Sequence, residues 1–253
     1  EILIAFTNIR LLLCGTFFIL IIIPFLIFLA TKLINIPIEL KAILVAWGSC
    51  PPLVSMPGLA LLIGLNGTAA LLILLLATLA FTLTLPILLA LLIDNNINID
   101  PISISAKLII IVCLCTFGAQ VLRKFLGKPV AKRVDPAAGG LIVILMAFFA
   151  VTIMGGIHHV WPTDPSRVLT FFLAATLVCI LSQLVCAMVF CKFDRSTSGT
   201  IALASGSRNL ALLLPVASGP FYENLWLFLA VIQIPVYFIP IISKPLYRNV
   251  YLK

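Results

Sequence analysis

The sequence predicts an all-α polytopic membrane protein, and three observations support that prediction. Of the 253 residues, 63% are apolar and only 9% are charged, and the mean hydropathy is +1.28. A soluble domain has about 45–50% apolar and about 25% charged residues, so a soluble globular fold is excluded. The apolar runs are continuous and reach the roughly 20 residues that a helix needs to cross a bilayer. A transmembrane β-barrel would instead alternate apolar and polar residues.

Eight apolar segments follow one another along the chain, and six of them are uninterrupted. The six predicted spans are residues 11–34, 67–93, 104–122, 137–157, 167–191 and 224–243. The other two segments, 39–65 and 197–219, are broken in the middle. The first is interrupted by Ser49–Pro52 and Met56–Gly58, and the second by Ser205–Asn209. Each half is too short to span alone, so both segments are predicted to be broken helices.

The distribution of charge predicts which side faces the cytoplasm. There are 16 Lys and Arg residues against 8 Asp and Glu residues, a net charge of +8. Alternating spans place eleven of these basic residues on the side of Arg10 and the C-terminal tail and four on the other side. The sixteenth, Arg208, lies within the broken segment 197–219. Because basic residues flank spans on the cytoplasmic side, we expect a bacterial inner (plasma) membrane protein with a cytoplasmic C-terminus. No basic cluster carries interleaved aromatics, so nucleic acid is not an expected partner.

The two broken helices indicate a transport site. Backbone that leaves a helix at membrane depth is tolerated only where protein or a water-filled cavity surrounds it. Paired discontinuous helices in two corresponding halves mark the binding site of many secondary transporters. Residues 11–93 and 167–243 both read as span, broken helix, span. A five-plus-five inverted repeat would need two further spans upstream of Glu1, which we expect. Taken singly, each break is also compatible with a Pro or Gly kink that serves packing only.

The residues around the breaks follow the motifs of a known family. The first break reads Cys-Pro-Pro-Leu-Val-Ser-Met-Pro over residues 50–57, and Leu65-Asn66 follows before a span that ends at Leu85-Pro86. The second reads Ala-Ser-Gly-Ser-Arg-Asn over residues 204–209. These stretches, with the lead-in from Arg10 to Pro37, resemble the bile acid:sodium symporter family over nearly the whole chain, as helices three to ten of ten.

The resemblance implies an inverted-repeat fold with two broken, crossing helices and a division into two domains. Residues 11–93 and 167–243 would form the two halves of the core domain. Residues 104–157 would supply helices of the smaller panel domain, without its first two helices. Alternating access would move the panel against the core.

The chain departs from that family at the positions that bind two sodium ions there. The first break of the family carries Ser-Asn, its second break carries Glu and Gln, and further ligands lie on the neighbouring spans. The matching positions here are Ile19, Met56, Pro57, Ala70, Leu74, Ala204 and Arg208. Sodium needs several oxygen ligands, and a guanidinium would repel the ion. The sodium coupling of the family is therefore predicted to be lost, and neither a metal site nor a cofactor is expected.

Arg208 is the most informative single residue for function, because its place in the second break puts it near mid-membrane. A charge at that depth costs at least about 2.5–3.5 kcal/mol, and no Asp or Glu lies within a predicted span. Three roles remain open. Arg208 could be a fixed cation that replaces the sodium ions and caps carbonyls at the break. It could hold an anionic substrate by a bidentate contact, or it could snorkel to water. The first two roles are compatible.

Further residues complete the predicted substrate site and crossover. The candidate substrate-binding residues besides Arg208 are Asn209, Ser207, Ser205, Ser55, Asn66 and Gln233. A half-helix starting at Asn209 is expected to aim its N-terminus at the crossing, which favours an anion. The candidate crossover and hinge residues are Pro51, Pro52, Pro57, Gly58 and Gly206. Ser182 and Gln183 lie in a neighbouring span, where interhelical hydrogen bonding and cavity lining both remain open.

No catalytic residue is predicted. The sequence carries no nucleotide-binding, metalloprotease or serine-hydrolase motif, and the seven cysteines include no CxxC pair. We therefore expect a secondary-active or facilitative transporter of a small organic anion, embedded in the lipid bilayer and not an enzyme. The alternative is a non-transporting membrane sensor or assembly subunit that retains the transporter fold. His158 and His159 fall in a predicted outer loop, as an interfacial feature or as a pH-sensitive gate.

Overall fold

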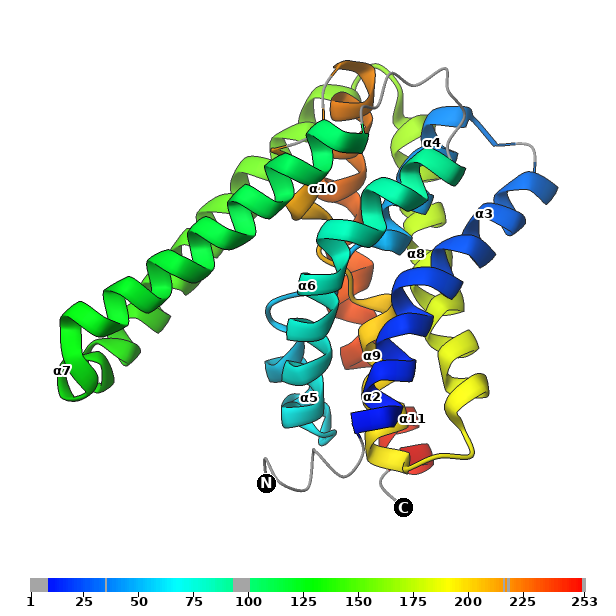
Figure 1. Ribbon diagram of the computed structural model, residues 1–253. Helices are drawn as coiled ribbons and strands as arrows, with labels where there is room; N and C mark the ends of the chain where they lie inside the picture. Colours follow the sequence, from blue (N-terminus) through cyan, green and yellow to red (C-terminus); the bar gives the residue numbers. More distant parts are fainter. Residues whose placement is uncertain (1–8, 35, 93–100, 216, 218, 252–253) are drawn as a thin grey trace.

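The computed structural model describes residues 9–34, 36–92, 101–215, 217 and 219–251, and these residues form an all-helical architecture (Figure 1). The first eight residues and most of the predicted loop 94–101 lie outside this range. Five helical stretches within it are long and apolar enough to cross a membrane: Ile9–Leu33, Gly67–Leu92, Ser105–Leu122, Pro165–Phe190 and Phe221–Ile242. They confirm the prediction of an all-α integral membrane protein and match five of the six predicted spans.

The first span is interrupted by a wider helical turn, which its continuous apolar run does not predict. It consists of α2 (Ile9–Phe17), the π-helical segment η1 (Phe18–Ile22) and α3 (Ile23–Leu33). Within η1 the Ile23 amide donates to the carbonyl of Phe18, five residues earlier. Pro24 follows at once and has no N–H to donate. A π-turn is a common response to such a local disruption of the helical ladder.

The predicted breaks in segments 39–65 and 197–219 are both present. The first broken segment forms α4 (Ile38–Ser49) and α5 (Met56–Ile63), separated by an irregular stretch that begins at Cys50. The second forms α9 (Arg195–Gly206), an extended stretch over 207–209 and the 3₁₀ turn η2 (Leu210–Leu213). Figure 1 shows α4 and α9 approaching the middle of the molecule from opposite ends.

The second half of that second segment differs from the prediction. The half-helix expected from Asn209 is replaced by the single 3₁₀ turn η2, and α10 (Gly219–Ile242) begins soon after. Pro215 lacks an N–H, so an α-helix through these residues would leave the carbonyl of Ala211 without its partner. The expectation of an anion-binding helix N-terminus at Asn209 is therefore wrong.

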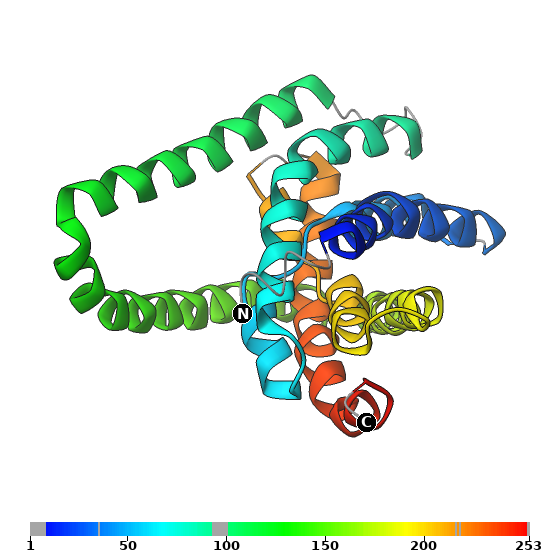
Figure 2. The ribbon, with the colours of Figure 1, turned by 60° about the horizontal axis from the view of Figure 1, so that its bottom comes forward.

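The predicted helices 104–122 and 137–157 belong to one helical run. After α6 (Gly67–Leu92), α7 extends from Pro101 to Val160 and includes residues 123–133, which separate the two predicted spans. His158 and His159 also belong to α7, so their predicted place in an outer loop is wrong. The run leads away from the body and turns back towards it (Figures 1 and 2), and it contacts both α6 and α10. Five of the eleven joining residues are Lys or Arg, which are good helix formers. Only 6% of its span Ser105–Leu122 is buried, so this part of α7 stands apart from the body.

The remaining helices enclose the crossing. α8 (Pro165–Phe190) packs along α9 and α10, and the short helix α11 (Lys244–Tyr251) follows α10 and contacts α9 and α5. The start of α2, the α8–α9 turn and α11 lie at the same end of the molecule (Figure 1), which we name the α11 end. Trp47, Arg208 and Phe228 are among the largest fully buried side chains. A charged side chain is thus enclosed in the core of the described residues.

Candidate functional site

The backbones of the two breaks pair with each other. The amide of Leu53 donates to the carbonyl of Ser207 at 2.8 Å, and the amide of Asn209 donates to the carbonyl of Pro51 at 2.8 Å. These bonds make an isolated antiparallel bridge between Pro52 and Arg208. Pro52 occupies a position in the bridge that needs no N–H, because the ladder bonds come from its neighbours. Two interruptions that would each be costly in a bilayer thus satisfy one another.

The Arg208 guanidinium lies inside this crossing and donates to backbone carbonyls only. Nε donates to Ser205 at 2.7 Å, Nη1 to Gly48 at 2.7 Å and to Cys50 at 2.9 Å, and Nη2 to Ile19 at 3.0 Å. The side chain is 1% exposed. Four of its five N–H donors are therefore used. These contacts are the carbonyl caps expected of a fixed cation at the break, and they argue against a side chain that snorkels to water.

The carbonyls that Arg208 caps at the two breaks are those that the helices leave without donors. In a continuing α-helix the carbonyl of Gly48 would accept from residue 52, which is a proline. The carbonyl of Ser205 would accept from Asn209, whose amide instead donates to Pro51. An unsatisfied buried carbonyl costs about 1–3 kcal/mol. The guanidinium thus compensates for both chain breaks at once.

The fourth carbonyl comes from the π-segment of the first span. The α-helical donor for Ile19 would be the amide of Ile23, which donates to Phe18 instead. The π-helical donor would be residue 24, and Pro24 has no N–H. Neither donor is available to the Ile19 carbonyl, and Nη2 of Arg208 takes that place. The sequence signal for this arrangement is Pro24, five residues after Ile19, which by itself is equally compatible with a simple kink.

The electrostatics of the crossing favour a cation. α4 and α9 both end there, and the C-terminal end of a helix carries about half a negative charge. The Arg208 guanidinium carbon also lies 5.6 Å from the ring centroid of Trp47, within the range of a cation–π contact. The charge of Arg208 is thus balanced by helix ends, carbonyl dipoles and an aromatic face, without a carboxylate among these contacts. Sequence reasoning missed Trp47, one turn before the break.

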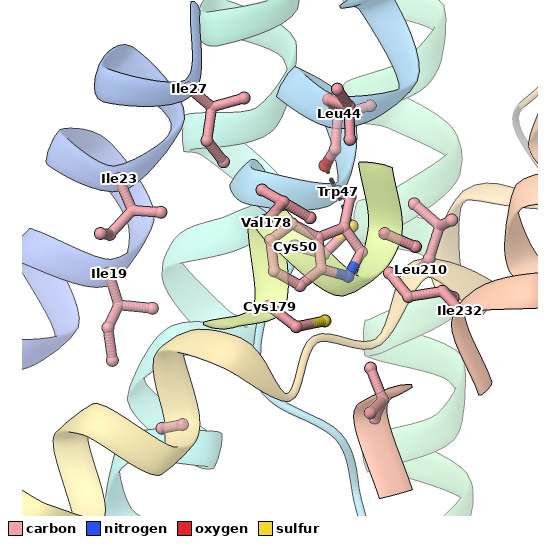
Figure 3. Close-up of a cluster of buried hydrophobic side chains, with 14 of the residues drawn as sticks. Ile19, Ile23, Ile27, Leu44, Trp47, Cys50, Val178, Cys179, Leu210 and Ile232 are labelled. Carbon is pink, nitrogen blue, oxygen red and sulfur yellow. Dashed lines mark hydrogen bonds between the residues drawn. The ribbon is translucent and has the colours of Figure 1, made fainter. Parts of the chain in front are cut away.

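Around this cation the crossing is apolar. Figure 3 shows Trp47 of α4, and Cys50 just after that helix, beside Val178 and Cys179 of α8, with the indole nitrogen on the side of Leu210. Four positions that match sodium ligands in the resembled family are completely buried, at 0% exposure: Ile19, Met56, Ala70 and Ala204. These side chains pack in the hydrophobic core cluster. They offer no oxygen to an ion.

Gly206 is required at the second break by close packing. A Cβ at this position would lie 2.4 Å from Nε2 of Gln183 and 2.7 Å from the carbonyl oxygen of Cys179. Any larger residue would force α8 and α9 apart. The sequence was compatible with interhelical hydrogen bonding or cavity lining for Gln183. The structure places its side chain in direct contact with the crossing. Its Oε1 accepts from the hydroxyl of Tyr247 in α11 at 2.9 Å, a contact between distant parts of the chain that no local motif announces.

The other predicted site residues are partly gathered at the crossing. Arg208, Ser207, Asn209, Pro51 and Pro52 meet there through the backbone bridge. Ser205 is beside them, but its hydroxyl donates to the carbonyls of Ser182 and Ala202 at 2.9 and 2.7 Å.

The remaining candidates lie elsewhere. The Oδ1 of Asn66 accepts from the amide of Ala69 at 2.9 Å, so Asn66 caps α6. Ser55, Pro57 and Gly58 lie at the start of α5. Gln233 is half-buried on α10.

Several buried polar atoms near the crossing have no partner in the part of the chain that the structure describes. They include the indole nitrogen of Trp47, the hydroxyl of Ser207 and the Nε2 atom of Gln183. Each of them can donate a hydrogen bond. Trp47 and Ser207 precede Gly48 and Arg208 in the chain, and Gln183 lies against Gly206. Such groups can hold a water or an acceptor-rich ligand. No family model and no curated protein sequence matches this chain.

Proposed function

We propose that the chain is a transporter of a small organic anion, secondary-active or facilitative, with a fold like that of the bile acid:sodium symporters. The observation that carries the proposal is the pairing of two interrupted helices around a buried cation. Irregular backbone of this kind occurs in membrane proteins where it is enclosed by protein or borders a cavity. Broken helices in two corresponding halves are typical of secondary transporters.

In this proposal Arg208 is a resident cation in place of the sodium ions. Its donors are engaged with carbonyls, so its contribution to anion binding is its charge. The direct contacts fall to neutral donors, for which the partnerless atoms of Trp47, Ser207 and Gln183 are the candidates. Asn209, which lies at the backbone bridge, is a further candidate donor. A carboxylate or a sulfonate has the acceptor oxygens that such donors bind.

Alternating access would then move α7 and its surroundings against the crossing. The crossing itself is tied by two backbone bonds and four guanidinium bonds, so it is suited to move as one unit. The span Ser105–Leu122 packs little against the body. In this proposal the core comprises residues 11–93 and 167–243, and the panel comprises residues 104–157.

Counterflow in proteoliposomes tests the proposal. Vesicles that contain the purified full chain are loaded with unlabelled monocarboxylates or sulfonates, and the uptake of the same labelled compound is measured in sodium and in choline buffer. Transport predicts exchange that is saturable, equal in both buffers and lost in Arg208→Ala. The matched control is Arg10→Ala, which removes an exposed arginine and should exchange normally. The absence of exchange for every anion would favour the non-transporting sensor or assembly subunit, and strong sodium dependence would contradict the resident cation.

A further inference from the structure

The short C-terminal helix α11 has three distinct faces, each built from residues four apart. Tyr247 and Tyr251 are 5% and 9% exposed and face the protein. Leu246 and Val250 are 59% and 50% exposed and form an apolar stripe. Lys244 and Arg248 form a basic stripe on the remaining side. A helix with separate apolar and basic faces is typical of segments that lie in a membrane interface.

The inward face of α11 is fitted to the protein. The ring of Tyr251 packs on Gly199 of α9, where an added Cβ would lie 2.9 Å from the Cγ atom of Tyr251. The Tyr247 and Tyr251 rings stack with their centroids 5.6 Å apart. Burial raises the pKa of the Tyr247 hydroxyl well above its ordinary value, and the nearby Tyr251 and Cys186 add to the rise. The hydroxyl therefore stays protonated and can act as a donor.

That donor leads directly to the crossing. The Tyr247 hydroxyl donates to Oε1 of Gln183 at 2.9 Å. The Nε2 atom of the same Gln183 side chain lies against Gly206, where a Cβ added to the glycine would be 2.4 Å from it. One amide group thus spans from α11 to the last residue of α9. Moving α11 away would remove the contact that orients Gln183 and would uncover this end of the crossing.

We propose that α11 is a latch that lies on an anionic lipid leaflet and closes the crossing from the α11 end. In the latched position the tyrosine face is buried, while the apolar stripe and Arg248 are exposed and Lys244 is half-buried, so both stripes can meet the bilayer. Lipid binding and closure therefore do not compete. The apolar stripe suits acyl chains, and the basic stripe suits anionic headgroups, which attract each nearby Lys or Arg. The leaflet charge stabilises the closed latch, and the latch does not depend on which substrate is moved.

The chain contains its own reporter for this latch. Cys186 is fully buried in α8, one turn beyond Gln183 and close to the two tyrosines. Cys191 is exposed near the end of α8, whereas Cys50 and Cys179 are buried at the crossing. The experiment follows alkylation of the full chain by N-ethylmaleimide in vesicles, quantified for each cysteine by peptide mass spectrometry. Cys191 is the positive reference, and labelling of Cys50 or Cys179 would reveal unfolding.

Two vesicle compositions test the lipid dependence. In an equal mixture of phosphatidylcholine and phosphatidylglycerol, Cys186 is expected to react more slowly than in phosphatidylcholine alone. The Arg248→Glu variant should lose most of this difference, about fivefold for one basic residue near an anionic surface. Arg10→Glu, in which the exposed arginine at the start of α2 is replaced, is the matched control and should keep the difference. Equal Cys186 labelling in both vesicle types would overturn the proposal.

Two variants at Tyr247 test the link to the crossing. Tyr247→Phe removes only the hydroxyl and is expected to raise Cys186 labelling about two- to tenfold, the effect of one lost hydrogen bond. Tyr247→Ala also removes the buried ring and should raise it further. In both variants Cys50 and Cys179 must stay protected. Cys186 labelling that is unchanged in both variants, or a rise shared equally by all buried cysteines, would show that α11 is not a latch. No transport substrate is present, so the outcome is separate from that of the counterflow test.

Discussion

The Nη2 atom of Arg208 donates to the carbonyl oxygen of Ile19 at 3.0 Å, which joins the second break to the first span across 189 residues. That carbonyl is free because η1 shifts the hydrogen-bond ladder and Pro24 has no N–H. The same guanidinium reaches Gly48 and Cys50 of the first break. A proline in one helix and an arginine in another are therefore parts of the same hydrogen-bonding arrangement.

We expect Pro24 and Arg208 to be energetically coupled. Pro24→Ala restores an N–H that can serve the Ile19 carbonyl, so one of the four carbonyls left by Arg208→Ala regains a donor. Arg208→Ala should then cost about 1 kcal/mol less in the Pro24→Ala background than in the parent chain. Thermal or denaturant unfolding in detergent measures the cycle. Pro86→Ala, at a proline inside α6, is the control and should show no coupling to Arg208. If the effects of Pro24→Ala and Arg208→Ala on the free energy of unfolding simply add, Pro24 and Arg208 are not coupled as described.

Arg208 variants should lose stability in proportion to the carbonyls they abandon. Arg208→Ala leaves four buried carbonyls uncapped and should lower the free energy of unfolding by about 4 kcal/mol or more. Arg208→Lys keeps the charge, but a single ammonium cannot reproduce the spread of donors from Nε to Nη2. The free energy of unfolding of Arg208→Lys should therefore lie between that of the parent chain and that of Arg208→Ala. Arg10→Ala, at an exposed position, should leave Tm unchanged, and a fully stable Arg208→Lys protein would argue against the importance of the fork.

Gly206 should not tolerate a side chain. Gly206→Ala places a Cβ within 2.7 Å of a backbone carbonyl and within 2.4 Å of Gln183, and overpacking of this kind costs about 1–3 kcal/mol. The matched change is Gly58→Ala in α5, where nothing lies within 4 Å of the added carbon and alanine favours the helix. Unfolding in detergent should show a lower Tm for the first variant and an equal or higher Tm for the second. Equal stability of both variants would exclude close packing as the reason for Gly206.

Trp47→Phe separates anion binding from the support of Arg208. The change removes the partnerless indole N–H but keeps an aromatic face towards the guanidinium. The smaller ring leaves a cavity in the core and should lower Tm, and the KM of the proposed exchange should in addition rise about tenfold for one lost donor to an anion. Trp161→Phe, at an exposed tryptophan, is the control for both measurements. A lower Tm with an unchanged KM would assign Trp47 a purely structural role.

The sequence predicted what depends on local patterns. Continuous apolar runs located the spans, and Pro and Gly clusters located both breaks, because these properties act within a few residues. The π-segment was not predicted, since Pro24 alone is compatible with a kink, and the Ile19 carbonyl becomes informative only beside Arg208. The contact of Tyr247 with Gln183 joins residues 64 apart and has no local signature.

Two predictions failed where several local signals competed. Residues 123–133 contain Gly127 and Pro129 among many helix formers, and the helix formers prevailed in α7. After Asn209 the apolar run suggested a half-helix, but Pro215 limits it to one 3₁₀ turn. The candidate site was predicted best at Arg208, because a charge within an apolar run is informative without any partner. Its carbonyl partners were not individually predictable, because every residue carries a backbone carbonyl whatever its side chain.

The attachment of the cation to the chain has a thermodynamic consequence. A dissociable ion stabilises the state that binds it by an amount that grows with the logarithm of its concentration. The guanidinium of Arg208 has no dissociation equilibrium, so it contributes equally at every ionic composition on either face of the membrane. In the proposed transporter, a sodium gradient would then have no binding reaction at the crossing on which to do work. If the proposed transport is uphill, its free energy must come from a second solute, and without one the protein can only bring its substrate to equal electrochemical potential on both sides.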